Sequence, residues 1–198
     1  MKNWFLLLTV SAAAAFSVGC QNPSANSAAT ADLPATVAEA QTQSNSLVEK
    51  LTGQIQQLAG QSEGTLKDLL TRLGASVSSG DDAASAGLLQ KIMTAKPSES
   101  QMSLLAEIRS SLAALALGRN FDTTDAATAS VLNETLSAIK GGNVTTIVSR
   151  LKNIGDKVSL TDAQKELVGN LVSSWTPSLA KAGESVNKLL DSAKDLGL

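Results

Sequence analysis

The stretch SESQMSLLAEIRSSLAALALG, residues 98–118, decides the fold class of this chain. Ser98 and Gln101 have the spacing of a capping box, in which each side chain bonds to the other's free backbone N–H. Apolar residues then recur at steps of three and four, the period of an α-helix; they are Met102, Leu104, Leu105, Ile108, Leu112 and Leu115. Gly118 is a stop signal. We therefore expect a long helix that begins after Ser98 and ends near Gly118.

The helical period continues on both sides of this stretch, and no segment favours a strand. Helices are expected at about 34–58, 65–79, 82–95, 98–117, 124–140, 144–154, 161–175 and 178–196, separated by turns of about two to six residues. Short turns place successive helices side by side and antiparallel. The fold class predicted for residues 34–198 is therefore an all-α, antiparallel multi-helix bundle that forms one domain.

Specific residues are expected to begin and end these helices. Pro34 suits the first turn of the first helix. Asp81 or Asp82 can cap the third helix, and Asn143 the sixth. The fifth helix would be capped by Thr123 or Thr124, after a turn at 120–122. A second capping box, formed by Thr161 and Gln164, opens the seventh helix, and Thr176–Pro177 is expected to end it.

An internal repeat is one reading of this pattern. A shift of 63 residues aligns apolar positions and both capping boxes: Leu69 with Leu132, Leu73 with Leu136, Leu88 with Leu151, and Gln101 with Gln164. The chain would then hold two related three-helix units plus flanking helices. The other reading is that Leu- and Ser-rich helices of similar length match by chance.

The first residues differ from the rest of the chain. Lys2 precedes an apolar or small run over residues 4–18. At about 15 residues this run is shorter than the roughly 20 that a membrane-spanning helix needs, and a basic start followed by an apolar run is typical of a secretory signal. We expect residues 1–19 to be a signal peptide that is no part of the fold.

The chain's one cysteine stands where this run ends, in Ser17-Val18-Gly19-Cys20. This motif resembles the lipobox of bacterial lipoproteins, although Ser17 stands where that family usually has Leu. The resemblance covers residues 1–20 only. It implies that the Cys20 thiol carries a diacylglyceryl group, with acyl chains such as palmitate, and that signal peptidase II cuts between Gly19 and Cys20. Later cleavage near residues 29–31, and an uncleaved anchor, are the alternatives.

Residues 20–33 carry few bulky apolar side chains and are predicted to be a flexible tether. Thirteen residues of flexible chain span roughly 20 Å root-mean-square. In a bacterium with two membranes, Gln21 after the lipidated cysteine resembles the signal for release to the outer membrane. The expected location is therefore the bacterial cell envelope, anchored through the N-terminal lipid, at the outer membrane and facing the periplasm.

The composition excludes several kinds of chemistry. The chain has no His and one Cys, so Ser-His or Cys-His catalysis and His-bearing metal sites are ruled out. A balance of 16 Lys+Arg against 18 Asp+Glu offers no basic stripe for phosphates, which argues against nucleic acid as a partner. We expect no cofactor and no metal.

Three features of the sequence are candidate sites. Ser178 and Lys181 have the Ser-x-x-Lys spacing of penicillin-recognising enzymes, but the spacing also occurs at Ser137 and Ser185, and the companion motifs are missing. The Asp81–Asp82 pair suits a helix cap better than a cation site. Trp175 fits a core position better than a ligand or partner contact. No catalytic residue is therefore assigned.

These observations favour a non-enzymatic function. We expect a membrane-anchored lipoprotein whose helical bundle serves as an interaction or structural module for a protein partner that the sequence does not name. The alternative is a binding protein that holds a small hydrophobic ligand or lipid in a cavity between helices.

Overall fold

The structure is a computed structural model that describes residues 33–181. The predicted signal peptide, the predicted tether before Leu33 and the predicted last helix beyond Lys181 lie outside the described residues. Within them the chain forms helices and no strands, which confirms the all-α bundle. The helices are α1 (Val37–Thr42), α2 (Ser44–Gly60), α3 (Gly64–Ser79), α4 (Asp82–Thr94), α5 (Glu99–Asn120), α6 (Ala126–Gly141), α7 (Val144–Lys157) and α8 (Asp162–Lys181).

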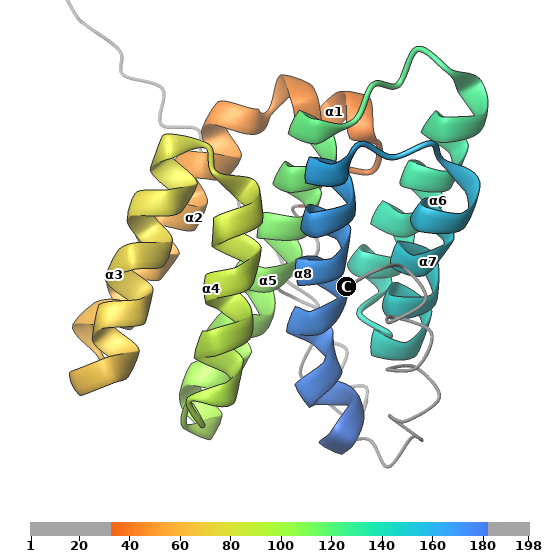
Figure 1. The fold of residues 1–198 in the computed structure, drawn as a ribbon. Coiled ribbons are helices and arrows are strands. Elements are labelled where there is room, and N and C mark those ends of the chain that lie inside the picture. The colour runs from red at the N-terminus through yellow and green to blue at the C-terminus, as the bar shows by residue number, and fades with distance from the viewer. Residues whose placement is uncertain (1–32, 182–198) are drawn as a thin grey trace, which may run out of the picture.

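Helix α5 lies inside the bundle, with α2, α3 and α4 on one side and α6 and α7 on the other (Figure 1). All its residues from Ile108 to Gly118 are buried. A helix that buries every face needs other elements of the fold all round it. The stretch that predicted a helix therefore forms the centre of the molecule.

Two hydrophobic cores meet on α5. The N-terminal core joins α2, α3 and α4 to one face of α5, to which Leu105, Ile108, Leu112 and Leu115 belong. The C-terminal core joins α1, α6, α7 and α8 to the opposite face, with Ala113, Ala114, Ala116 and Leu117. The larger side chains of α5 thus point one way and mostly alanines the other, and α1 approaches the second face closely at Gly118.

Both halves of the chain use the same local devices. Gly80 and Gly142 end α3 and α6 in the left-handed conformation, with φ of 79° and 71°, where an L side chain is disfavoured. Asp81 and Asn143 then cap α4 and α7. Capping boxes open α5 and α8, as predicted. This shared order agrees with two related three-helix units; that they arose by duplication stays a prediction.

Two predicted helix starts are wrong. The first helix is divided at Gln43 into α1 and α2, because α1 packs Val37 in the C-terminal core while α2 packs Leu47 in the N-terminal core. Thr36, rather than Pro34, stands at the start of α1. Helix α6 is capped by Asp125 and not by Thr123 or Thr124. The Asp122 carboxylate accepts from the Thr124 N–H and holds those threonines in the preceding turn.

The predicted break at Thr176–Pro177 is also wrong, since α8 continues through Pro177. A proline inside a helix removes one backbone donor and disturbs the turn before it. Side chains supply hydrogen bonds to carbonyls of that turn: Ser174 Oγ donates to Leu171 O at 2.7 Å, and Thr176 Oγ1 donates to Val172 O at 3.3 Å. Arg109 of α5 donates to the carbonyl of Ser174 at 3.0 Å.

The crossing of α1 over α5 gives a first prediction. A Cβ on Gly118 would lie 2.9 Å from Ala40 Cβ and 3.1 Å from the Ala40 carbonyl carbon. Gly118→Ala should therefore lower the free energy of unfolding by about 1–3 kcal/mol, since overpacking outweighs the better helix propensity of alanine. Urea denaturation followed by circular dichroism measures it.

Gly53→Ala is the matched control. It stands inside α2, is exposed, and a Cβ there meets nothing within 4 Å. This substitution should raise the free energy of unfolding by up to about 1 kcal/mol. Equal stabilisation by both substitutions would show that α1 does not lie against Gly118 at this distance.

Candidate functional site

The predicted lipidation residue Cys20 and the predicted cleavage site between Gly19 and Cys20 lie outside the described residues. Leu33, the last residue of the predicted tether, is buried in the C-terminal core. Its carbonyl accepts a hydrogen bond from Lys140 Nζ at 3.4 Å. Leu33 thus packs with the helical domain, although it was assigned to the predicted tether.

The Ser-x-x-Lys motifs have other hydrogen-bond partners where the structure describes them. Ser178 Oγ accepts from Arg109 Nη1 at 2.9 Å. In the motif that begins at Ser137, Lys140 Nζ donates to the Leu33 carbonyl. Ser185 lies outside the described residues. The hydroxyl of Ser178 therefore takes part in a partly buried polar contact between α5 and α8.

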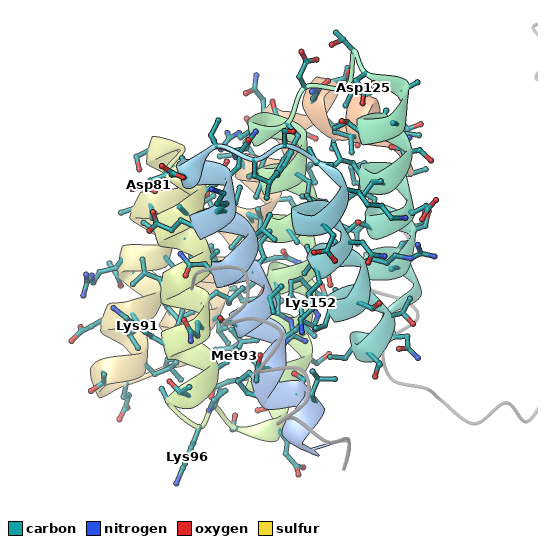
Figure 2. All side chains as sticks on the ribbon, turned by 45° about the vertical axis from the view of Figure 1, so that its right-hand side comes forward. Asp81, Lys91, Met93, Lys96, Asp125 and Lys152 are labelled. Atoms are coloured by element: carbon teal, nitrogen blue, oxygen red, sulfur yellow. The ribbon has the colours of Figure 1, made fainter. Side chains whose placement is uncertain are left out.

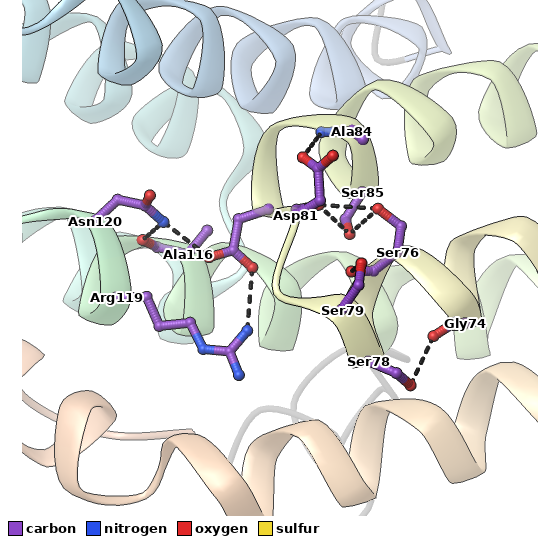
Figure 3. Close-up of polar contacts among 11 residues, drawn as sticks. Gly74, Ser76, Ser78, Ser79, Asp81, Ala84, Ser85, Ala116, Arg119 and Asn120 are labelled. Carbon is purple, nitrogen blue, oxygen red and sulfur yellow. Dashed lines mark hydrogen bonds and ion pairs between the residues drawn. The ribbon is translucent and has the colours of Figure 1, made fainter.

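The two aspartates of the Asp81–Asp82 pair make separate contacts. Asp81 caps α4 by accepting from the Ala84 N–H at 2.9 Å, and its carbonyl accepts from the hydroxyls of Ser76 and Ser85 (Figure 3). Figure 2 shows Asp81 and Asp125, the caps of α4 and α6, at the same end of the bundle. The cap predicted at the pair is confirmed for Asp81.

Asp82 is buried and contacts the C-terminal end of α5. Its Oδ2 accepts from Asn120 Nδ2 at 2.8 Å, and its Oδ1 lies 3.4 Å from Arg119 Nη1. Burial raises the pKa of the Asp82 carboxyl above its usual value, and the Asn120 and Arg119 contacts only partly oppose this. Asp82 therefore joins α4 to α5 by charged hydrogen bonds while burial disfavours its ionised form.

Trp175 is a core residue, as favoured from the sequence. It is 1% exposed and is the largest of the fully buried side chains among the described residues. The guanidinium carbon of Arg109 lies 4.8 Å from the centroid of its ring, a cation–π distance. Because this contact and the Ser178 hydrogen bond join α5 to α8, we call Arg109, Ser174, Trp175 and Ser178 the arginine cluster.

Arg109 is the unusual member of the cluster, and sequence reasoning missed it. Its side chain is buried at 6% exposure. Nη1 makes both of its hydrogen bonds, to the Ser174 carbonyl and to Ser178 Oγ, while Nε is buried without a partner. The sequence does contain an indication of this burial. Arg109 stands in a helix that has apolar residues on both faces, so covering those residues also covers Arg109.

The arginine cluster has the chemistry of an anion contact. Burial lowers the pKa of Arg109 to about 10, so the group stays charged at neutral pH. A guanidinium offers five N–H donors and no acceptor. It cannot serve as a nucleophile or as a base under these conditions, and its free donors can hold a carboxylate or phosphate.

Two hollows lie on the surface of the described residues. The α2–α3 groove encloses about 260 Å³ and is lined by Thr52, Ile55, Gln56, Ala59, Leu70, Thr71, Gly74, Ala75 and Ser78. The Thr52 hydroxyl is buried there and has no hydrogen-bond partner. The α6–α7 hollow is wider and shallower, and it contains the ion pair between Glu134 and Arg150. The first therefore fits a small ligand better.

No group of three or more His, Cys, Asp or Glu residues among residues 33–181 could hold a metal ion. None of the helices in this part of the chain is long and apolar enough to cross a membrane. Comparisons with protein-family models, curated proteins and solved structures find no match to this chain.

Asp82 gives a prediction on pH dependence. A carboxyl whose pKa is higher in the folded state binds protons more tightly there, so its contribution to stability is complete below about pH 4 and is lost as the pH rises through the folded pKa. Asp82→Asn removes the titrating carboxyl, so the variant should not lose stability in this way as the pH rises. The stability of the wild type relative to the variant should therefore decline as the pH rises from 4 to 7.

Asp125→Asn is the control of opposite sign. The Asp125 pKa is lowered because its side chain accepts from Thr128. Its contribution is present above the unfolded pKa and is lost as the pH falls, and asparagine keeps the cap. Urea titrations between pH 3 and 7 compare the two. A wild-type stability that rises with pH relative to Asp82→Asn would contradict the raised pKa.

Proposed function

We propose that this protein is a bacterial envelope lipoprotein, anchored through a lipid on Cys20, whose helical domain is a non-enzymatic interaction or structural module. The observation that carries the proposal is the sequence Ser17-Val18-Gly19-Cys20 at the end of an apolar run that follows Lys2. Small residues before the cut and a thiol at the acceptor position are what lipid attachment and cleavage require.

The position of Leu33 supports an anchored domain. Leu33 packs in the C-terminal core, and the short polar segment 21–32 separates it from Cys20 in the sequence. Such a segment would hold the domain roughly 20 Å from the membrane surface. Release to the outer membrane, facing the periplasm, is proposed from Gln21.

The chemistry of the described side chains supports a role without catalysis. Asp81 and Asp125 serve as helix caps, and Asp82 is held by Arg119 and Asn120. Arg109 is buried against Trp175. The two caps thus stabilise the starts of their own helices, and Asp82 and Arg109 join different helices, which is the work of a rigid scaffold for protein contacts.

The α2–α3 groove favours a second candidate function, the binding of a small amphiphilic ligand. Ile55, Ala59 and Leu70 supply apolar walls, and the unpartnered Thr52 hydroxyl supplies one hydrogen-bonding group. The lining carries no charged side chain. A neutral ligand with an apolar body and one polar end fits this lining best.

Lipidation is tested with Cys20→Ser. Mass spectrometry of the wild-type N-terminus, isolated from the envelope, should find a chain that begins at Cys20 and carries acyl groups. Labelling of cells with an alkyne-bearing palmitate analogue should mark the wild type, and Cys20→Ser should lose the label completely because no thiol remains to accept the lipid.

Ser24→Ala in the predicted tether is the matched control and should keep both the label and the N-terminus. An unmodified wild-type peptide that begins after Ala31 would overturn the anchor, as would labelling of the Cys20→Ser chain. Membrane fractionation alone does not decide the point, because an uncleaved signal peptide also holds a chain at the membrane.

The ligand hypothesis is tested with Gly74→Leu. A Cβ on Gly74 lies at an ordinary 3.5 Å from Ile55 Cγ2, so a larger side chain enters the groove without displacing backbone. Native mass spectrometry of the protein isolated from its envelope should show a bound molecule that Gly74→Leu loses and the exposed Gly53→Leu keeps. Equal occupancy in both variants would contradict this use of the groove.

A further inference from the structure

The α2–α3 groove is formed by two antiparallel helices at one edge of the bundle (Figure 1). Its centre lies where Gly74 faces Ile55, since a Cβ on Gly74 would lie 3.5 Å from Ile55 Cγ2. Because the helices run in opposite directions, residues before Ile55 face residues after Gly74. Thr52 therefore lies at the same end of the groove as Ser78, and Ala59 lies at the other end.

The hydroxyls that line the groove differ in the hydrogen bonds they can still make. Ser78 Oγ donates to the Gly74 carbonyl at 2.9 Å, and Thr71 Oγ1 donates to the Lys67 carbonyl at 2.9 Å. Each of these hydroxyls has used its one proton and can only accept a further bond. Thr52 Oγ1 is buried without a partner, so it can both donate and accept. The hydroxyls therefore offer more acceptors than donors, and an occupant must bring donors of its own.

This surplus of acceptors selects among the polar ends that an amphiphile can carry. A carboxylate or an ester has acceptors and no donor, so it could bond to Thr52 and would leave Ser78 facing a second acceptor. A carboxylate would also lack a counter-ion in the described lining, and an ammonium would lack a carboxylate. An alcohol or a primary amide is neutral and both donates and accepts, so it matches both hydroxyls.

The volume of the groove limits the apolar body of the ligand. About 260 Å³ corresponds to roughly nine groups the size of a water molecule, at about 30 Å³ each. The buried side chains of Ile55 and Leu70 supply the apolar surface for this body. A chain of roughly eight carbon atoms with one polar end therefore fills the groove.

We propose that the α2–α3 groove binds a neutral amphiphile that ends in an alcohol or a primary amide. The polar end lies between Thr52 and Ser78, and the apolar body extends toward Ala59. This inference names the ligand class of the second candidate function and rests on the groove being a ligand site. It does not depend on a lipid at Cys20.

The experiment compares two probes of equal chain length, 1-octanol and octanoate, at pH 7, where the octanoate carboxyl is ionised. Each probe is titrated into the full chain, and the backbone amide signals are followed by ¹H–¹⁵N NMR. 1-Octanol should shift signals within residues 52–59 and 70–78, which contain the lining. Its affinity should exceed that of octanoate by at least about tenfold, because the carboxylate would be buried without a partner.

Four variants test the contacts of the polar end and of the body. Thr52→Val keeps the shape of the side chain and should weaken 1-octanol binding about fivefold, the usual effect of one hydrogen bond, while Thr52→Ser should stay within about twofold of the wild type. Gly74→Leu should abolish binding, and the exposed Gly53→Leu should leave it unchanged. Equal affinities of the Thr52→Val and wild-type chains would overturn the assigned position of the polar end.

The stability of the free protein gives an independent measurement. Without a probe, Thr52→Val should lower the unfolding equilibrium constant about two- to fivefold, because it replaces a buried hydroxyl that has no partner. Urea denaturation measures this change. A higher unfolding constant in Thr52→Val would show that the hydroxyl is already bonded within the chain, and it would overturn the proposal.

The probes also separate a wrong ligand class from a wrong site. If octanoate bound as tightly as 1-octanol and Gly74→Leu abolished both, the groove would still be a ligand site and the inferred class would be overturned. If neither probe shifted the signals of residues 52–59 and 70–78, both the class and the use of the groove as a ligand site would be overturned.

Discussion

The fold depends on the burial of α5 on both faces. Leu105, Ile108, Leu112 and Leu115 need one set of partners, and the alanine-rich face that ends at Gly118 needs another. No pair of helices can satisfy both, so the chain must build a core on each side. The element order follows from this need: α2 and α4 lie against one face and α1, α6 and α8 against the other, while α3 and α7 complete the two cores (Figure 1).

The shared helix also explains which parts of the structure could be predicted from the sequence. Caps and apolar periods act within a few residues, so the Ser98 and Thr161 capping boxes and the glycine at Gly142 locate helices correctly. The break at Gln43 depends on which core each helix joins, and a local pattern does not carry that information. The same holds for Pro177, because the hydrogen bonds to carbonyls of the turn before it include one from Arg109, which is far away in sequence.

The candidate functional residues also divide into those that a contiguous motif predicts and those that only the packing brings together. The lipobox resemblance is a contiguous motif, so sequence alone could propose Cys20. The arginine cluster joins residues that are more than sixty positions apart, and only the packing of α5 against α8 brings them together. From the sequence alone, Arg109 is one charged residue on a helix. Whether its side chain is exposed or buried depends on whether another helix covers that face.

Two buried charged residues contact α5 or belong to it: Asp82 of α4 and Arg109 of α5. Their hydrogen bonds constrain the helix packing differently from the apolar contacts. Apolar contacts are non-directional, so two cores of Leu, Ile, Val and Ala tolerate small shifts of helix register. Asp82 bonds to Asn120 at the end of α5, and Arg109 bonds to Ser178 on α8. Each contact is lost if its helix slides by one turn, because the donor and acceptor then part by about 5 Å. Polar groups that cost free energy on burial can in this way select one arrangement of α4, α5 and α8 among several of similar apolar burial.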